Sequence, residues 1–308
     1  MHNRRFILID APVDCGKTQR GCALGPDALR AAGLVKALHW LGALVEDTGA
    51  LTPPPFAPED PSDSVHARNE TAAWTRVVSE ATEQAATRGV PIVLGGDHAL
   101  SMGSVAGMAR YAARMNRPLY VLWLDAHSDF HTPHTTTSGH LHGCPLAYVT
   151  GRPGFDGFPP VPHPVPLHNI CMFGLRSVDP AERAALHTTP VRQLHLRDTD
   201  ETGIAAPLSA FLDTVRATNG LLHVSLDVDV LDPRLAPGVG TPVTGGLSLH
   251  AAHLVMDMLR DSGLISALDL VELNPFLDDH GRTAQLLVDL ATSLLGLPEL
   301  RQPTRAIA

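Results

Sequence analysis

Apolar and polar positions along the chain follow two alternating periods. Short apolar, often β-branched runs bounded by Gly, Pro or Asp predict buried strands, and they lie at Phe6–Ile9, Pro91–Leu94, Leu119–Leu124, Ile170–Phe173, Leu222–Leu226 and Ile265–Leu270. Amphipathic stretches predict helices, and they lie at Pro26–Leu41, Asn69–Thr87, Ser101–Arg114, Ala206–Thr218 and Ser248–Leu259. Strand and helix therefore alternate almost throughout.

This alternation predicts the fold class. Consecutive strand, helix and strand form right-handed crossovers, which place helices on both faces of a parallel sheet. We expect a three-layer α/β/α fold with a mainly parallel central sheet, in one domain over residues 1–308, of which 301–308 form a flexible tail. A TIM barrel is the competing topology.

Composition narrows the class of protein. The 308 residues are 44% hydrophobic and 18% charged, which is enough apolar surface for a folded core. Charged residues interrupt the long apolar stretches, so we expect no membrane association, and the N-terminus lacks the apolar core of a signal peptide. A net charge of −9 without a basic cluster argues against nucleic acid as a partner. Four cysteines without a C-x-x-C pair favour reduced thiols, and we expect a cytoplasmic enzyme.

Three of the predicted strands run directly into acids or histidines, at Gly95-Gly96-Asp97-His98, Asp125-Ala126-His127-Ser128-Asp129 and Asp227-Val228-Asp229. In parallel sheets, functional side chains gather beyond the carboxyl ends of the strands. Alternate residues of an extended strand exit point the same way, and the glycines permit a sharp turn. Four carboxylates and two imidazoles should therefore converge: His98, Asp125, His127, Asp129, Asp227 and Asp229.

Six such ligands suit a pair of divalent ions about 3.5 to 4 Å apart that activate a water near neutral pH. An oxygen-rich set without thiolate favours Mn²⁺ over structural zinc. Taken alone, the polar residues of each motif could simply cap a helix or form a turn. Gly95-Gly96 alone is also compatible with a phosphate-binding turn. Convergence of three strand ends favours the metal site, because clustered carboxylates without a cation carry a large desolvation and repulsion cost.

The order of these motifs resembles that of the ureohydrolase family, which includes arginases and agmatinases. The matching segments are Gly-Gly-Asp-His at 95–98, Asp-Ala-His-Ser-Asp at 125–129, Thr-Thr-Thr-Ser-Gly-His-Leu-His-Gly at 135–143, Ser-Leu-Asp-Val-Asp-Val-Leu-Asp-Pro at 225–233 and Val-Glu-Leu-Asn-Pro at 271–275. The resemblance runs from the first strand to Leu290 and is greatest to the bacterial arginases.

The resemblance implies two Mn²⁺ ions bridged by Asp125 and Asp227. One ion would be held by His98, Asp125, Asp129 and Asp227, and the other by Asp125, His127, Asp227 and Asp229. It further implies that Asp129 accepts a hydrogen bond from the attacking hydroxide and passes its proton on, that Glu272 anchors the guanidinium, and that His142 carries a proton to the leaving amine.

Substrate contacts are implied in the same way. Asp179 and Glu182 correspond to positions that bind the α-ammonium, although Glu182 could equally be a solvated first-turn acid. Thr241 lies where the family contacts the guanidinium end. Where arginases commonly use asparagines for the α-carboxylate, this chain has His131 and His140, and it keeps Ser138 between them. An imidazole N–H can still donate to that carboxylate.

The expected function is hydrolysis of a small guanidino substrate, L-arginine, to L-ornithine and urea, by a homo-oligomer that is a trimer or a hexamer, as the family implies. Ser177, where an aspartate is frequent in the family, removes a charge near the substrate amine. Agmatine, guanidinobutyrate and N-hydroxyarginine are therefore alternative substrates. A single-metal amide deacetylase would not need His98, Asp129 or Asp229, and a non-catalytic regulatory relative would have lost ligands.

Overall fold

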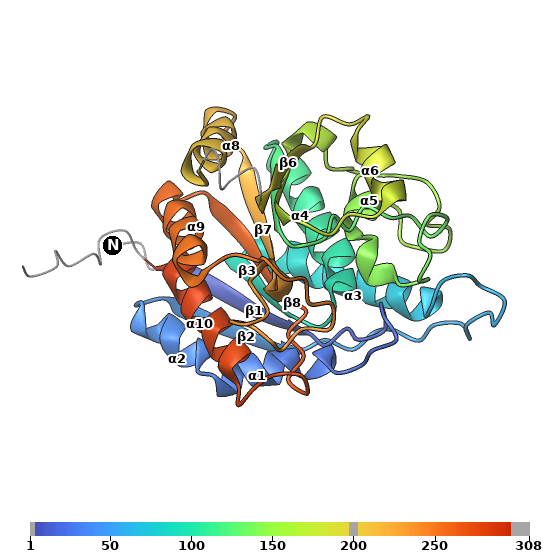
Figure 1. The fold of residues 1–308 in the computed structure, drawn as a ribbon, viewed down its shortest axis with the longest axis horizontal. Coiled ribbons are helices and arrows are strands. Elements are labelled where there is room, and N and C mark those ends of the chain that lie inside the picture. The colour runs from blue at the N-terminus through green and yellow to red at the C-terminus, as the bar shows by residue number, and fades with distance from the viewer. Residues whose placement is uncertain (1–3, 197–202, 297–308) are drawn as a thin grey trace, which may run out of the picture.

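The computed structural model describes residues 4–196 and 203–296 (Figure 1). Eight parallel strands form one sheet in the order β2-β1-β3-β8-β7-β4-β5-β6. Their bounds are β1 Arg5–Ala11, β2 Leu44–Ala50, β3 Val90–Gly95, β4 Leu119–Leu124, β5 Ile170–Leu175, β6 Arg192–His195, β7 Leu221–Asp227 and β8 Ile265–Val271. The tail expected at 301–308 lies outside the described residues.

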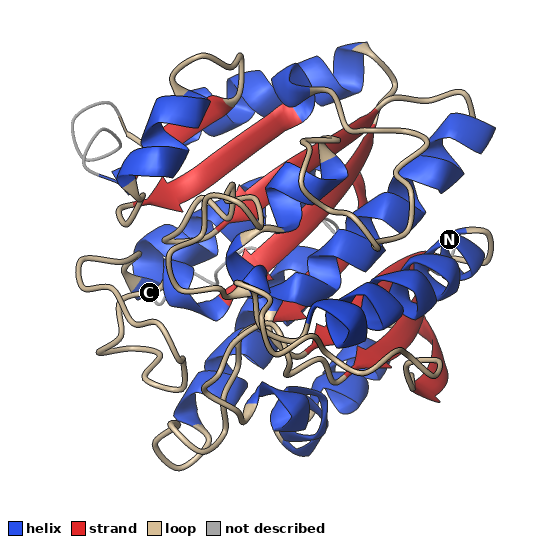
Figure 2. Cartoon of the chain, turned by 90° about the vertical axis from the view of Figure 1, so that its right-hand side faces the viewer, coloured by secondary structure: helices blue, strands red, loops and turns tan. Residues whose placement is uncertain are grey.

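Helices cover both faces of this sheet, as Figure 2 shows. The α-helices are α1 Gly25–Ala31, α2 Leu34–Trp40, α3 Arg68–Ala86, α4 Ser101–Arg114, α5 Pro145–Val149, α6 Pro180–Leu186, α8 Ala205–Ala217, α9 Leu249–Ser262 and α10 Arg282–Leu295. Short 3₁₀ turns lie at η1 Cys22–Leu24, η2 His98–Leu100, η3 Leu141–Gly143, η4 Leu167–Asn169 and η5 Val228–Val230. The three-layer α/β/α prediction is confirmed, and an open sheet with edges at β2 and β6 excludes the TIM barrel.

The two faces of the sheet bury separate cores. In β1, Phe6 and Leu8 face a core shared with α1, α2, α8, α9 and α10. Ile7 and Ile9 point to the opposite side, where α3 packs, and α4 and α5 pack on that same side farther along the sheet. Burial of both faces explains why the strand segments are almost continuously apolar.

All six predicted strands are present, and the two strands that were missed lie at the sheet edges. β2 reads Leu-Val-Glu-Asp-Thr-Gly-Ala, and none of its residues is buried. β6 is only four residues long and half-buried. An edge strand has one neighbour and does not need an apolar run, so periodicity gave no signal for either.

The helix predicted at Pro26–Leu41 is wrong as a single element. It divides into α1 and α2 at Gly33, whose φ of 98° lies outside the helical region. The predictions for α3, α4, α8 and α9 are confirmed to within a few residues. Over the part of the chain that the structure describes, no helix has the length and hydropathy that crossing a membrane requires.

The topology gathers the chemistry at the middle of the sheet. β3, β8, β7 and β4 are consecutive neighbours there. Because all strands are parallel, their carboxyl ends meet at one edge. His98, Glu272, Asp227 and Asp125 lie at or just after the ends of these four strands in that order.

Candidate metal centre and active site

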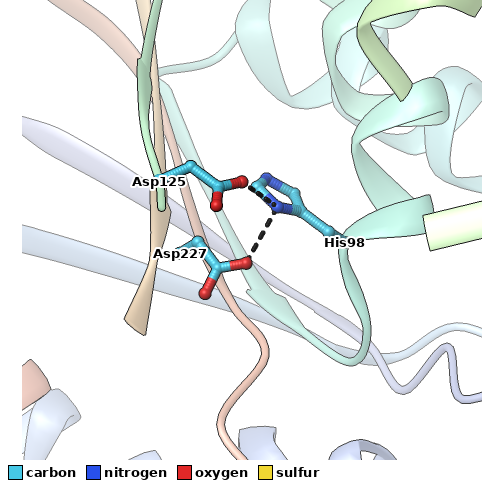
Figure 3. Close-up of side chains that lie close together, drawn as sticks. All are labelled: His98, Asp125 and Asp227. Atoms are coloured by element: carbon cyan, nitrogen blue, oxygen red, sulfur yellow. Dashed lines mark ion pairs between the residues drawn. The ribbon is translucent and has the colours of Figure 1, made fainter. Parts of the chain in front are cut away.

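His98 lies at the centre of a buried cluster of carboxylates. Its Nδ1 is 3.1 Å from Asp125 Oδ2, 3.1 Å from Asp129 Oδ2 and 3.0 Å from Asp227 Oδ2. Figure 3 shows Asp125 and Asp227 reaching toward the His98 ring from neighbouring strands. The three strand ends therefore bring together the imidazole and three carboxylates that the sequence predicted.

A second group shares Asp125. His127 Nδ1 lies 3.4 Å from Asp125 Oδ1 and 2.9 Å from Asp229 Oδ2. Asp125 thus directs one oxygen to His98 and the other to His127, which is the arrangement that a bridging carboxylate requires. All six predicted ligands lie in these two overlapping groups.

Backbone donors hold the carboxylates in place. The N–H of His127 donates to Asp125 Oδ1 at 2.6 Å, that of Asp229 to Asp227 Oδ1 at 2.8 Å, and that of Ala126 to Asp229 Oδ1 at 3.0 Å. Asp129 has a φ of 47°, in the left-handed region that a non-glycine residue rarely adopts. Such local strain is typical of functional sites in which the surroundings fix the side chain.

Side chains behind the cluster fix His98, and sequence reasoning missed them. Ser225 Oγ lies 2.8 Å from His98 Nε2, the nitrogen that faces away from the carboxylates. Trp123 stacks on the ring at a centroid distance of 4.1 Å and donates its Nε1–H to Asp125 Oδ2 at 3.0 Å. A partner on the second ring nitrogen orients a metal-binding histidine. The only signal in the sequence for Ser225 and Trp123 was their position, because each lies two residues before a predicted metal ligand.

Burial and mutual repulsion shift the ionisation of the cluster. Burial, reinforced by the charge of Asp125, raises the pKa of Asp129 to about 7. Burial and the neighbouring Asp229 raise the pKa of Asp227 well above its usual range. Burial alone would lower the pKa of His127, but hydrogen bonds with Asp125 and Asp229 outweigh it and raise that pKa to about 12. The cluster therefore favours positive charge among its oxygens.

The donor set fits divalent cations. His98 Nδ1 is fully buried and makes no well-aligned hydrogen bond to any described residue, although three carboxylate oxygens surround it. Two sets of ligand atoms, each close enough to hold one ion, share Asp125: His98 with Asp125 and Asp227, and Asp125 with His127 and Asp229. An imidazole nitrogen facing several carboxylate oxygens suits Mn²⁺ or a similar ion.

A cavity of about 300 Å³ opens above the cluster. Its lining combines cluster residues with the predicted substrate contacts: His127, Asp129, Asp227, His131, Ser138, His140, His142, Asp179, Glu182 and Thr241. The structure therefore brings most of the predicted site residues to one space. Four predicted site residues are not among the described residues that line the cavity: His98, Asp125 and Asp229, which belong to the cluster beneath it, and Glu272.

Glu272 lies buried behind His142. Its Oε1 accepts the His98 backbone N–H at 2.9 Å and lies 2.9 Å from His142 Nδ1. Its Oε2 pairs with Lys17, a residue that sequence reasoning missed. Lys17 and His142 outweigh the effect of burial and hold the pKa of Glu272 well below its usual range. Burial would lower the pKa of His142, but Glu272 outweighs it and raises that pKa.

The predicted α-amino-acid contacts form a looser group at the cavity wall. His131 Nε2 lies 3.1 Å from Asp179 Oδ2, and its Nδ1 lies 3.1 Å from Thr135 Oγ1. Glu182 is buried and accepts the backbone N–H groups of Phe130 at 2.9 Å and Asp179 at 3.1 Å. It thus caps α6, so the solvated alternative for Glu182 is wrong.

His140 and Thr241 complete the wall. The His140 ring lies between those of His66 and His142, at centroid distances of 5.4 and 5.7 Å, and its Nε2 is 3.2 Å from Thr18 Oγ1. Thr241 Oγ1 donates to Asp229 Oδ2 at 3.3 Å. This contact places Thr241 beside the carboxylate cluster, where it also lines the cavity.

Comparison with known proteins agrees with this geometry. The model of the arginase family matches residues 4–296. Arginases of Brucella melitensis and Agrobacterium fabrum are 52% and 51% identical, covering 96% and 94% of this chain and 98% and 90% of their own. The structure of Bacillus caldovelox arginase superimposes with a TM-score of 0.86 at 33% identity, covering 96% of this chain and 98% of that one. The chain therefore belongs to the arginase family, whose members hydrolyse guanidino C–N bonds.

Proposed function

We propose that this protein is a dinuclear manganese hydrolase that cleaves L-arginine to L-ornithine and urea. The observation that carries the proposal is the cluster of two imidazoles and four carboxylates at the floor of a cavity of about 300 Å³. Such an arrangement is suited to a two-metal site. The relatives at 51% and 52% identity, both named arginases, support the substrate.

His98, Asp125, Asp129 and Asp227 would hold one ion, and Asp125, His127, Asp227 and Asp229 the other. When bound, the ion pair would supply Lewis acidity and lower the pKa of water at the site toward neutrality. The ligand set contains oxygen and imidazole nitrogen without thiolate, which favours Mn²⁺ over zinc. Asp129 belongs to the cluster and also lines the cavity, so its carboxylate is suited to accept a proton from the attacking water.

His142 would protonate the leaving amine. Because Glu272 stays ionised, its Oε1 acts as an acceptor and His142 Nδ1 as the donor. The hydrogen bond fixes the tautomer and raises the pKa of the imidazole, so that a proton is available near neutral pH. Nε2 of His142 remains for the substrate, since His142 lines the cavity.

The cavity wall would recognise the amino-acid end of arginine. Asp179 and Glu182 supply negative charge for the α-ammonium, while His131, Ser138 and His140 offer donors for the α-carboxylate. Thr241 would contact the guanidinium end. A wall that carries both signs of charge suits an α-amino acid better than an amine without a carboxylate.

One feature of the wall favours a second candidate. His140 Nε2 is already within hydrogen-bond distance of Thr18, so this nitrogen can serve an α-carboxylate only by giving up that contact. A guanidino compound lacking the α-carboxylate, such as agmatine, is therefore the alternative substrate.

Urea release separates these candidates. The purified protein, loaded with Mn²⁺, is assayed with arginine, agmatine, guanidinobutyrate and N-hydroxyarginine at equal concentrations. The proposal expects the highest kcat/KM for arginine. A higher value for agmatine would establish the alternative, and no urea from any of the four would contradict both.

Assembly and compartment belong to the same proposal. Resemblance to the family supports a homo-oligomer, a trimer or hexamer, in the cytoplasm. Light scattering on the purified protein should give three or six times the 32.8 kDa of one chain. A mass of one chain at working concentration would contradict the assembly.

A further inference from the structure

Lys17 and Glu272 form a buried ion pair next to the proposed active site. The exposed fractions of the two side chains are 2% and 1%. Lysine is rare in this sequence, which contains Lys17 and Lys36 and otherwise uses arginine for its basic side chains. Lys36 is exposed on α2. One of two lysines is therefore placed on the carboxylate that the resemblance assigns to the guanidinium.

The backbone before Lys17 is clamped on both sides. The Gly16 N–H donates to Asp97 Oδ2 at 2.7 Å, and the Gly16 carbonyl accepts the His142 N–H at 3.1 Å. A Cβ at position 16 would lie 2.7 Å from Asp97 Oδ1 and 3.0 Å from the His142 nitrogen, so only glycine fits. These contacts fix the backbone on the N-terminal side of Lys17, while the following residues Thr18, Gln19 and Arg20 are exposed.

Glu272 has no open face. Its Oε1 is used by the His98 backbone N–H and by His142 Nδ1, and its Oε2 by Lys17 and by the Cys22 thiol at 3.8 Å. The described residues that line the cavity include His142 but neither Glu272 nor Lys17. A ligand in the cavity therefore contacts the Glu272 carboxylate only after the Lys17 ammonium has moved away.

We propose that Lys17 is a specificity-determining residue that occupies Glu272 in the resting site, so that a guanidinium substrate must displace an ammonium already bound. This inference rests on the proposed function and on the role of guanidinium anchor that the family resemblance implies for Glu272. Lys17 has a long flexible stem and exposed neighbours, so its ammonium can leave toward solvent. The exchange replaces one cation by another and leaves the charge beside Glu272 unchanged.

Guanidinium and ammonium differ as partners of a carboxylate. A guanidinium presents a planar fork of two N–H groups, whereas an ammonium acts as a compact point charge. A guanidino ligand can therefore replace the Lys17 ammonium by a better-matched partner. The δ-ammonium of ornithine offers only the group that Lys17 already supplies, so the exchange favours release of the product.

Kinetics of Lys17→Met and Lys17→Gln test the exchange. If Lys17 competes with the substrate for Glu272, the substrate's apparent affinity equals its intrinsic affinity multiplied by the fraction of molecules in which Lys17 has left Glu272. Both variants should therefore lower the KM for arginine by about ten- to a hundredfold, the range for a hydrogen bond to a charged group, and should strengthen inhibition by ornithine by the same factor. Norleucine, which has no side-chain cation, should inhibit as before.

The controls separate competition from damage. Lys36→Met removes the other lysine, from the surface, and should leave every constant unchanged. Lys17→Gln keeps a donor for Glu272 without the charge, so it serves if Lys17→Met fails to fold. An unchanged or raised KM in a folded Lys17→Gln variant, with the metal content of the wild type, would overturn the proposal, because Lys17 would then support Glu272 instead of competing for it.

A labelling experiment tests the same exchange without catalysis. The native protein is treated with an amine-acylating reagent, with and without millimolar guanidinium chloride, and sodium chloride serves as the salt control. Mass spectrometry should show Lys17 protected alone and labelled severalfold faster with guanidinium, while labelling of Lys36 stays constant. Guanidinium that inhibits competitively without exposing Lys17 would overturn the proposal. Because no turnover is needed, a wrong substrate assignment leaves this result interpretable.

Discussion

The floor and the wall of the cavity are built in different ways. The floor comprises His98, Asp125, His127, Asp129, Asp227 and Asp229, all placed by strand ends and, except for His127, at most 7% exposed. The wall includes His131, Ser138, His140 and Asp179, which lie on connecting segments, and the Asp179 side chain is 59% exposed. Parallel strands fix the floor, whereas loop residues set the wall.

Their contacts differ in the same sense. Floor carboxylates accept backbone N–H groups and lie against buried side chains such as Trp123. Wall residues contact mainly one another and other loop side chains, as His140 does with Thr18 and His66. The difference indicates that the strands of the fold position the residues for hydrolysis, whereas loop residues of the wall determine which substrate binds. Substitutions at the floor should therefore remove the reaction, and those at the wall should redirect it.

The largest effect is expected from Asp125→Asn at the floor. Asp125 is the carboxylate that both ligand groups share, so the variant should lose activity below detection and bind fewer ions. Elemental analysis and urea release on the same sample provide the check. Asp179→Asn, at the wall, is the matched control and should keep its full metal content. An active Asp125→Asn variant with two tightly bound ions would contradict the claim that the floor carboxylates hold the metal and are required for hydrolysis.

Removing metal should destabilise the whole protein. A ligand that binds only the folded state adds about 4 kcal/mol per site when its free concentration is a thousand times the dissociation constant. Chelation should therefore lower the Tm, and Mn²⁺ should restore it, because the ions offset repulsion among the floor carboxylates. Calorimetry with and without chelator measures this. An unchanged Tm would mean that no ion stabilises the floor.

Ser225→Ala tests the support beneath the floor. Its hydroxyl is the partner of His98 Nε2 at 2.8 Å, and loss of such a partner typically weakens metal binding by about ten- to a hundredfold. Metal titration monitored by activity should show this shift, with kcat at saturating metal changed less. Ser138→Ala at the wall should leave the metal titration curve in place. Equal curves for the wild type and both variants would show that Ser225 does not support metal binding.

At the wall, His140→Ala should raise the KM for arginine and lower kcat/KM by about tenfold, the low end for a hydrogen bond to a charged group, because His140 is only half-buried. His140→Asn should keep activity with arginine. Steady-state kinetics on arginine and agmatine decide the role of this ring. Equal kcat/KM for the three proteins would show that His140 does not contact the substrate, and a sharp gain for His140→Asn would show a wall retuned for another guanidine.

The smallest effect is a shift of the pH profile, which is separate from the loss of kcat expected when the guanidinium loses the Glu272 carboxylate. Glu272 raises the pKa of His142 against the opposing effect of burial. The protonated imidazole, which donates to the leaving amine, therefore persists above the usual histidine pKa and is lost as pH rises through the raised value. Glu272→Gln should move the alkaline limb of the kcat profile to lower pH. A limb that stays in place would mean that another group sets it.

The sequence predicted the floor well because each of its residues is tied to a strand end. An apolar run followed by Asp-x-His-x-Asp or Asp-x-Asp contains both the location and the direction of the side chains. Neither Ser225 nor Trp123 could be assigned, since a serine and a tryptophan inside a strand look like ordinary core residues. Lys17 carried no signal either, because its contact with Glu272 joins residues 255 positions apart.

Metal stoichiometry of the purified protein tests the central claim most directly. Equilibrium titration with Mn²⁺ followed by elemental analysis should give two ions per chain, and urea release from arginine should appear only as the ions bind. Asp125→Asn, measured in parallel, should bind fewer ions and release no urea. Full activity with one ion or none per chain would contradict the assignment of the strand-end cluster as a two-metal hydrolytic site.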